Sequence, residues 1–157
     1  MPQMFVHFLS LPLLLKIYSL ITKKDFDRNT YLFAAFCGVV PDFDVIFVFL
    51  NYVIPMPTYL MHGYITHTFF FGVLFFLFCN KYTSLIGLGI ITHVILDCVL
   101  GGGHQYGLML LYPFSDTRYA IGLLKMFKVN ILVYLDILVF FIWILYLHFT
   151  DKIKKIM

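Results

Sequence analysis

The sequence predicts an all-α fold, a polytopic membrane bundle of about five apolar helices that forms one domain over residues 1–157. The chain is 62% hydrophobic and 12% charged, whereas soluble domains are about 45–50% apolar and about 25% charged. A water-soluble domain of this length could not bury so much apolar surface, but a bilayer removes the need to bury it. Backbone groups in lipid must satisfy their own hydrogen bonds, and the alternation typical of barrel strands is absent. We therefore expect the spans to be helices.

The apolar segments differ in how well they match a membrane span. They cover approximately residues 4–21, 31–54, 59–79, 84–100 and 129–149. Because a span needs about 20 residues, the third and fifth are long enough, and the first and fourth are marginal. The second is expected to break near Pro41, since proline lacks a backbone donor and disfavours helix at the preceding residue. The more polar stretch 101–128 is expected to be a loop with a short interfacial helix near 118–128.

The loops between these segments predict the orientation and the partners of the chain. If all the segments cross, seven Lys and Arg residues lie on one side, in 22–30, 80–83 and 150–157, and three lie on the other. The side richer in positive charge is expected to be cytoplasmic, which places the N-terminus outside and the C-terminus inside the cell membrane. A first segment that does not cross would change this count. The lipid bilayer is the expected partner, and no basic aromatic surface indicates binding of nucleic acid.

Asp and His residues of the apolar segments gather toward the outer ends of the spans in this topology. The chain contains no Glu, so every acid is an Asp. An ionisable side chain at the centre of a span costs about 2.5–3.5 kcal/mol on insertion scales, and each one is therefore a candidate functional residue. The candidates for a metal site are His7, Asp42, Asp44, His62, His67, His93 and Asp97.

Imidazole and carboxylate ligands together suit a divalent metal, zinc first, with manganese or iron as alternatives. His93 and Asp97 are four residues apart and share one helix face, so both can reach one ion. Asp42 and Asp44 follow Pro41 and suit an irregular turn that presents both carboxylates. Two simpler interpretations stay open. A histidine in an apolar helix often makes only an interhelical hydrogen bond, and the two aspartates could cap the broken helix.

Three further polar residues are weaker candidates. His104 follows three glycines and is either a substrate contact or a loop residue. Arg118 is a candidate anchor for an anionic substrate, and its alternative is an interfacial side chain that snorkels to water. Asp136 is alone in the last segment, where it is expected to pair with a buried basic or polar group.

Four motifs follow one another along the chain. They are Val39-Val40-Pro41-Asp42-Phe43-Asp44, His62-x4-His67-Thr68, His93-x3-Asp97 and Leu111-Tyr112-Pro113-Phe114-Ser115. Over about residues 5–122 this pattern resembles the membrane-bound metal-dependent hydrolase family, also known as the LexA-regulated inner-membrane hydrolase group. The resemblance implies a distant likeness to zinc-dependent phospholipase C, and it implies that the seven Asp and His residues bind metal. One difference is that Gly63 stands where the family has an arginine, a residue suited to binding an anionic substrate.

The expected function is a membrane-embedded, metal-dependent hydrolase near the outer face, with a lipid or another phosphoester as substrate. The metal would lower the pKa of a bound water, and Asp42 or Asp44 would be a bridging ligand or the general base. The expected ligands are His62, His67, His93 and Asp97. The non-enzymatic alternatives are an ion or proton transporter that uses the same cluster, a haem protein with two axial histidines, and a structural bundle. A transport pathway would need polar residues through the full depth of the membrane, whereas these lie in one half.

Overall fold

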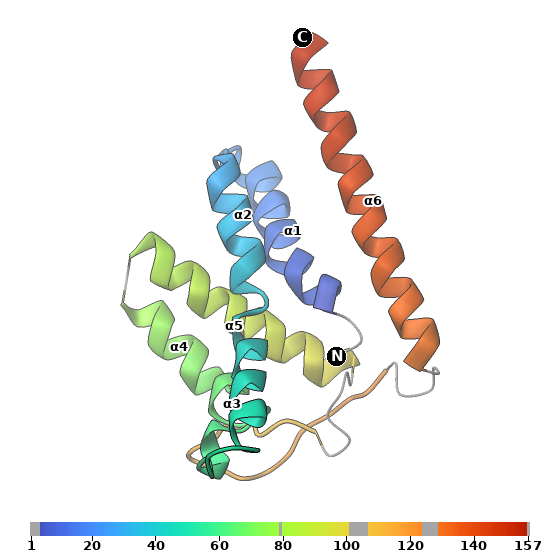
Figure 1. Cartoon of the computed structure of the whole chain (residues 1–157). Coiled ribbons are helices and arrows are strands. Elements are labelled where there is room, and N and C mark those ends of the chain that lie inside the picture. Colours follow the sequence, from blue (N-terminus) through green and yellow to red (C-terminus); the bar gives the residue numbers. More distant parts are fainter. Residues whose placement is uncertain (1–3, 79, 101–106, 124–128, 157) are drawn as a thin grey trace.

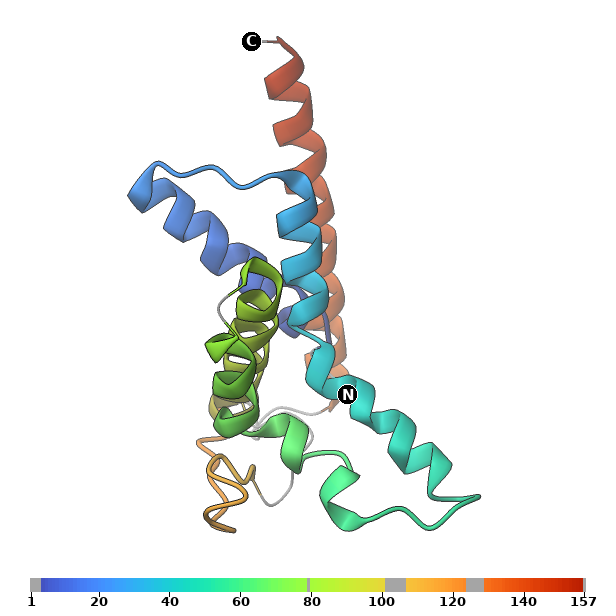
Figure 2. The same cartoon turned by 90° about the vertical axis from the view of Figure 1, so that its left-hand side faces the viewer.

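The protein is built of helices that pack around one central helix (Figures 1 and 2). The computed structural model describes residues 4–78, 80–100, 107–123 and 129–156. Its α-helices are α1 (Met4–Thr22), α2 (Arg28–Cys37), α3 (Val45–Leu50), α4 (Phe69–Leu77), α5 (Lys81–Leu100) and α6 (Val129–Ile156). Its short 3-10 helices are η1 (Val40–Asp44), η2 (Thr58–Leu60) and η3 (Ile65–His67). The prediction of an all-α fold is confirmed, because β pairing in the described residues is limited to an isolated bridge between Leu108 and Tyr119.

The central helix is α5, which contacts α1, α2, α4, η1 and η3. Its buried side chains belong to two apolar clusters. One cluster joins Leu85 to Leu11 of α1 and Ala34 of α2, and the other joins Ile90 and Val94 to Leu108. Many large apolar side chains of the other helices face outward. Such an apolar exterior suits lipid, which solvates these side chains as well as a protein core does.

The helices are long enough for a membrane protein, although the number of spans predicted from sequence is not established. Among the described residues, α1 and α5 are long and apolar enough to cross a membrane. The bent pair of α2 and Val40–Leu50 is a third span if it counts as one. Helix α6 has 28 residues, and the part of it whose side chains are described continuously, Val133–Leu145, is apolar. About five spans therefore remains a prediction.

The predicted break in the second segment is confirmed at Pro41. α2 ends at Cys37, and the chain continues as the 3-10 helix η1 before α3 begins. The two halves of the segment are bent by 48°. Pro41 lies at the start of η1, where its missing N–H costs no helical hydrogen bond. The irregular turn predicted for the two aspartates is therefore η1, the 3-10 helix that contains both of them.

The prediction of one continuous span over residues 59–79 is wrong. The structure contains η2 and η3 in the first part of this stretch, and helix α4 runs only over Phe69–Leu77. The physical reason is local: Thr68 has an extended backbone and its hydroxyl accepts a hydrogen bond from the Phe71 N–H at 3.1 Å, so that the helix starts there. The residues before Thr68 therefore lie outside α4, and they carry two of the candidate histidines.

The predicted interfacial helix near 118–128 is absent from the part of this stretch that the structure describes. Residues 118–123 are extended or in a turn, and Tyr119 pairs with Leu108 through two backbone hydrogen bonds of 2.9 Å. Residues 124–128 lie outside the described residues. The bridge uses the backbone donor and acceptor of Tyr119, which a helix would need for its own hydrogen bonds.

Several connections between the helices lie at two opposite ends of the structure. Figure 1 shows the turn between α1 and α2 at the upper end, and the stretches 51–68 and 107–123 together at the lower end. Figure 2 shows the same separation from the side. The start of α1, η1 and the end of α5 lie near one another at mid-height in Figure 1, above these lower stretches. Helices that alternate in direction thus bring their corresponding ends to one level.

Replacing Thr68 with valine is expected to destabilise the fold by about 1–2 kcal/mol, because the N-cap hydrogen bond is lost. The hydroxyl also donates to the Ile65 carbonyl at 2.9 Å, and Thr68 is fully buried, so both partners would be left without a hydrogen bond. The free energy of unfolding in detergent, compared with the wild type, measures the effect. Thr68→Ser is the matched control and should stay near the wild type; equal stability of Thr68→Val would contradict the assignment.

Candidate metal centre

All seven predicted Asp and His residues lie in one buried cluster. They come from four parts of the chain: the first turns of α1, the 3-10 helix η1, the stretch from 62 to 67, and the second half of α5. The side chains are between 0% and 19% exposed. The cluster consists of His7, Asp42, Asp44, His62, His67, His93 and Asp97.

Four atoms form the centre of this cluster and are called the central quartet below. They are Asp42 Oδ1, His67 Nε2, His93 Nε2 and Asp97 Oδ2. His93 Nε2 lies 3.4 Å from each carboxylate oxygen. His67 Nε2 lies 3.6 Å from Asp42 Oδ1 and 3.9 Å from Asp97 Oδ2. A tetrahedral zinc ion with bonds of about 2.0–2.1 Å holds its ligand atoms about 3.3–3.4 Å apart, and the two distances from His93 Nε2 match this spacing. Within the quartet, Asp42, His67 and His93 are the three donors that all lie within reach of one ion.

The donors of the quartet fit a metal better than they fit one another. Asp42 Oδ1 and His93 Nε2 are buried and make no hydrogen bond in the structure. Buried polar atoms almost always have a hydrogen-bond partner, since an unsatisfied one costs about 1–3 kcal/mol. Two unsatisfied lone-pair atoms that face the same point are therefore the arrangement expected when a cation is the partner.

Each quartet histidine is oriented by a polar contact at its second ring nitrogen, Nδ1. His93 Nδ1 lies 2.7 Å from the Gly38 carbonyl oxygen, which can only accept, so Nδ1 donates its proton and Nε2 keeps its lone pair toward the quartet. His67 Nδ1 lies 3.3 Å from Asp44 Oδ2. Metal-binding histidines almost always donate their second ring N–H in this way, which orients the ring and raises its basicity.

The two aspartates of η1 take different positions. Asp42 directs Oδ1 into the quartet, whereas Asp44 is 2% exposed and directs both oxygens away from it. Asp44 Oδ1 pairs with His62 Nδ1, and Asp44 Oδ2 accepts a hydrogen bond from the Thr66 hydroxyl besides contacting His67. Asp42 thus faces the quartet, whereas Asp44 contacts two histidines on its other side.

His7 extends the cluster on the side of α5. Its Nε2 lies 3.1 Å from Asp97 Oδ1, and its ring stacks on the His93 ring with centroids 3.9 Å apart. Three groups of donor atoms could each hold an ion. They are His7, His93 and Asp97; Asp42, His67 and His93; and Asp44, His62 and His67. Because His67 and His93 each occur in two groups, the groups overlap and are not three independent sites.

Arg118, one of the weaker candidates, is not part of the cluster. Arg118 Nη1 donates to the Gly107 carbonyl at 3.3 Å, and its guanidinium lies 5.9 Å from the centre of the Tyr64 ring. Tyr64 belongs to the stretch between His62 and His67, so Arg118 is near the cluster through this residue without contacting it. His104 lies outside the described residues.

Two residues that support the cluster were missed by the sequence analysis. Thr66 bonds Asp44, and no sequence pattern distinguishes it from other threonines. Gly38 supplies the carbonyl that orients His93, and it directly precedes the motif Val39-Val40-Pro41-Asp42-Phe43-Asp44, so its position beside that motif was an available signal. Gly63 has a φ of 86°, a left-handed conformation that disfavours the arginine found there in the family that the sequence resembles.

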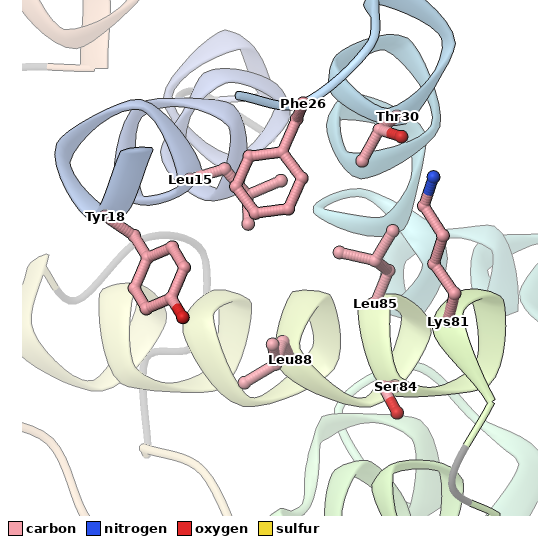
Figure 3. Close-up of a pocket in the computed structure, with 8 residues that line it drawn as sticks. All are labelled: Leu15, Tyr18, Phe26, Thr30, Lys81, Ser84, Leu85 and Leu88. Atoms are coloured by element: carbon pink, nitrogen blue, oxygen red, sulfur yellow. The ribbon is translucent and has the colours of Figure 1, made fainter. Parts of the chain in front are cut away.

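A separate cavity of about 270 Å³ lies at the other side of α5, between α1, α2 and the start of α5. Figure 3 shows Leu15 and Phe26 on one wall, Leu85 and Leu88 on another, and the Lys81 side chain at the rim. None of the seven cluster residues lines it. The Asp and His cluster and this apolar cavity therefore lie in different parts of the molecule.

A family model described as YdjM inner membrane protein matches residues 4–154, nearly the whole chain. The chain belongs to the YdjM inner membrane protein family. Searches of curated proteins and of solved structures gave no match. The match and the apolar helices together identify an inner membrane protein, as the resemblance to an inner-membrane group implied. The YdjM description names a location and no activity, so the reaction has to be argued from the cluster.

Proposed function

We propose that this YdjM-family protein is a membrane-embedded hydrolase that uses a divalent metal, zinc first, to cleave a phosphoester of a lipid or a similar substrate. The observation that carries the proposal is the central quartet, whose carboxylate and imidazole atoms lie 3.4–3.9 Å apart. Two imidazoles with two carboxylates are a donor set that suits zinc, manganese or iron. Both imidazoles are already oriented by Gly38 and Asp44.

The quartet residues would hold the ion, which when bound acts as a Lewis acid and makes hydroxide available near neutral pH. His62 is the most exposed member of the cluster, with 19% of its side chain accessible. Asp44 accepts a hydrogen bond from His62 Nδ1, so the lone pair of a neutral His62 lies on Nε2, an atom that is itself buried in the cluster. We assign proton transfer to this atom: it takes the proton of the attacking water and returns it to the alkoxide that leaves.

The bonds change in one displacement at phosphorus. The water oxygen forms a bond to phosphorus, the ester P–O bond breaks, and the leaving oxygen takes the proton held on His62 Nε2. Asp44 keeps the imidazole oriented and stabilises its charged form. We place this chemistry in the outer half of the membrane, because the Lys- and Arg-rich stretches lie at the opposite end of the helices.

Metal analysis of the protein purified in mild detergent tests the centre. We expect a stoichiometric divalent metal that a chelator removes and that zinc restores. Hydrolysis of phospholipid and of soluble phosphoesters by the same preparation, with and without chelator, tests the reaction. A chain that stays free of metal after incubation with zinc, manganese and iron would contradict the centre. A metal-loaded chain without hydrolysis of any phosphoester would contradict the reaction alone.

Replacing Asp44 with asparagine is expected to weaken zinc binding about tenfold to 100-fold, the range known for the outer partners of metal ligands. The amide has one acceptor oxygen where the carboxylate has two, and it cannot serve both His62 and His67. Zinc affinity is measured by competition with a chromophoric chelator. Asp116→Asn, at an exposed position, is the control. Unchanged affinity in Asp44→Asn would show that Asp44 does not orient the ligands.

A further inference from the structure

Helix α6 contains a buried carboxylate, that of Asp136. Among the side chains of α6 that the structure describes, at 131 and 133–145, it alone is buried, with 6% of its surface exposed. Phe140 and Trp143 are half-buried, and the others face outward. A carboxylate in an apolar helix is costly unless it has partners. The attachment of α6 to the bundle therefore depends on what Asp136 contacts.

The partners of Asp136 are backbone groups of the first helix. The Phe5 N–H donates to Asp136 Oδ2 at 3.1 Å, and the Val6 N–H donates to Asp136 Oδ1 at 2.9 Å. The first N–H groups of a helix have no acceptor within the helix and carry the positive end of its dipole. The Asp136 carboxylate of α6 thus caps the N-terminus of α1, although Asp136 and Val6 are 130 residues apart in the sequence.

A ring contact supports this attachment beside the hydrogen bonds. The Phe5 ring stacks on the Phe140 ring, one turn along α6 from Asp136, with centroids 4.3 Å apart. The first turn of α1 is therefore held in position and in rotation about the helix axis. The residue that follows this turn is His7, whose Nε2 reaches Asp97 Oδ1 at 3.1 Å and whose ring covers His93.

We propose that Asp136 is a positioning residue of the metal centre: by binding the first amides of α1 it sets the place of His7 against Asp97 and His93. The effect on metal rests on the function proposed above, whereas the effect on the place of His7 does not. The proposal also gives α6 a role. The helix carries no member of the cluster in its described part, yet it holds the element that supplies one.

The test compares Asp136→Ala and Asp136→Asn with Tyr134→Ala, which alters an exposed residue of the same helix. The first readout is the modification of His7 by diethyl pyrocarbonate in metal-free protein, followed by mass spectrometry of the His7 peptide. The second is zinc affinity by chelator competition. Size-exclusion elution and circular dichroism confirm the fold, and if the alanine variant does not fold, the asparagine variant carries the test.

We expect His7, buried in the wild type, to react at least about tenfold faster in Asp136→Ala, and zinc to bind about tenfold to 100-fold more weakly. Asp136→Asn should lie between, because its amide keeps one acceptor oxygen for the two N–H donors. Unchanged reactivity of His7 in both variants overturns the proposal. Faster reaction of His7 with unchanged zinc affinity overturns the link to the metal. Faster reaction of His7 in a protein whose wild type binds no zinc supports the positioning of His7 and contradicts the metal centre instead.

Discussion

Replacing His93 with alanine is expected to abolish metal binding, with a loss of affinity greater than about 100-fold. Loss of an outer partner alone costs about tenfold to 100-fold, and His93 is a central donor, with Nε2 at 3.4 Å from both quartet carboxylates. The measurement is the metal content of purified protein, together with zinc affinity by chelator competition. Hydrolysis should fall to the level of the chelated wild type.

The same substitution has an effect on stability that separates ligation from packing. His93 is fully buried, and its removal leaves a cavity and takes the hydrogen bond from the Gly38 carbonyl, which is expected to destabilise the metal-free protein by about 2–5 kcal/mol. Ile95→Ala, an exposed position of the same helix, is the control for changes in α5. Metal content that is the same in His93→Ala and the wild type would disprove the proposed centre.

Replacing Gly38 with alanine is expected to destabilise the protein by about 1–3 kcal/mol, the usual cost of overpacking a buried contact. A Cβ at Gly38 would lie 2.2 Å from the His7 carbonyl oxygen and 3.4 Å from the Ala35 carbonyl oxygen. Because the nearer atom is backbone, α1 has to move away from the end of α2. That movement displaces His7 and the Gly38 carbonyl, which accepts from His93, so zinc affinity should fall as well.

The thermal unfolding midpoint in detergent and the zinc affinity measure the two effects of Gly38→Ala. Val45→Ala, at a partly exposed position in α3, is the control for a small change in the same bent segment. If Gly38→Ala unfolds at the same temperature as the wild type and keeps its zinc affinity, the close approach of α1 and α2 does not exist in solution.

Much of the fold follows from local sequence patterns. The share of apolar residues predicts membrane helices, because the transfer of apolar side chains into lipid depends only on composition and length. Pro41 predicts the bend, because its ring acts on its own turn of backbone. The same logic fails for residues 59–79: they are apolar enough for a span, yet hydrogen bonding at Thr68 starts the helix late. Hydropathy measures the free energy of transferring this stretch into lipid, and it does not include the hydrogen bond at Thr68.

The members of the cluster could be chosen from sequence, but not their roles. Asp42 and Asp44 have nearly the same sequence context, and the sequence analysis treated them as equivalent. In the structure only Asp42 faces the quartet, since residues two apart in a 3-10 helix of about three residues per turn point in different directions, and Asp44 points toward His62 and Thr66. The direction of a side chain in an irregular turn depends on neighbours that arrive from elsewhere in the chain.

Sequence alone determined that this chain has apolar membrane helices, a break at Pro41, and Asp and His residues that gather in one cluster. Tertiary structure alone decided which atoms meet: His93 with Gly38, Asp42 with His67, and Asp136 with the first amides of α1. Asp136 was expected to find a buried partner, and that partner is backbone. The physical reason is that periodicity and burial energy are local properties of a segment, whereas a metal cluster depends on distances between atoms that packing alone brings together.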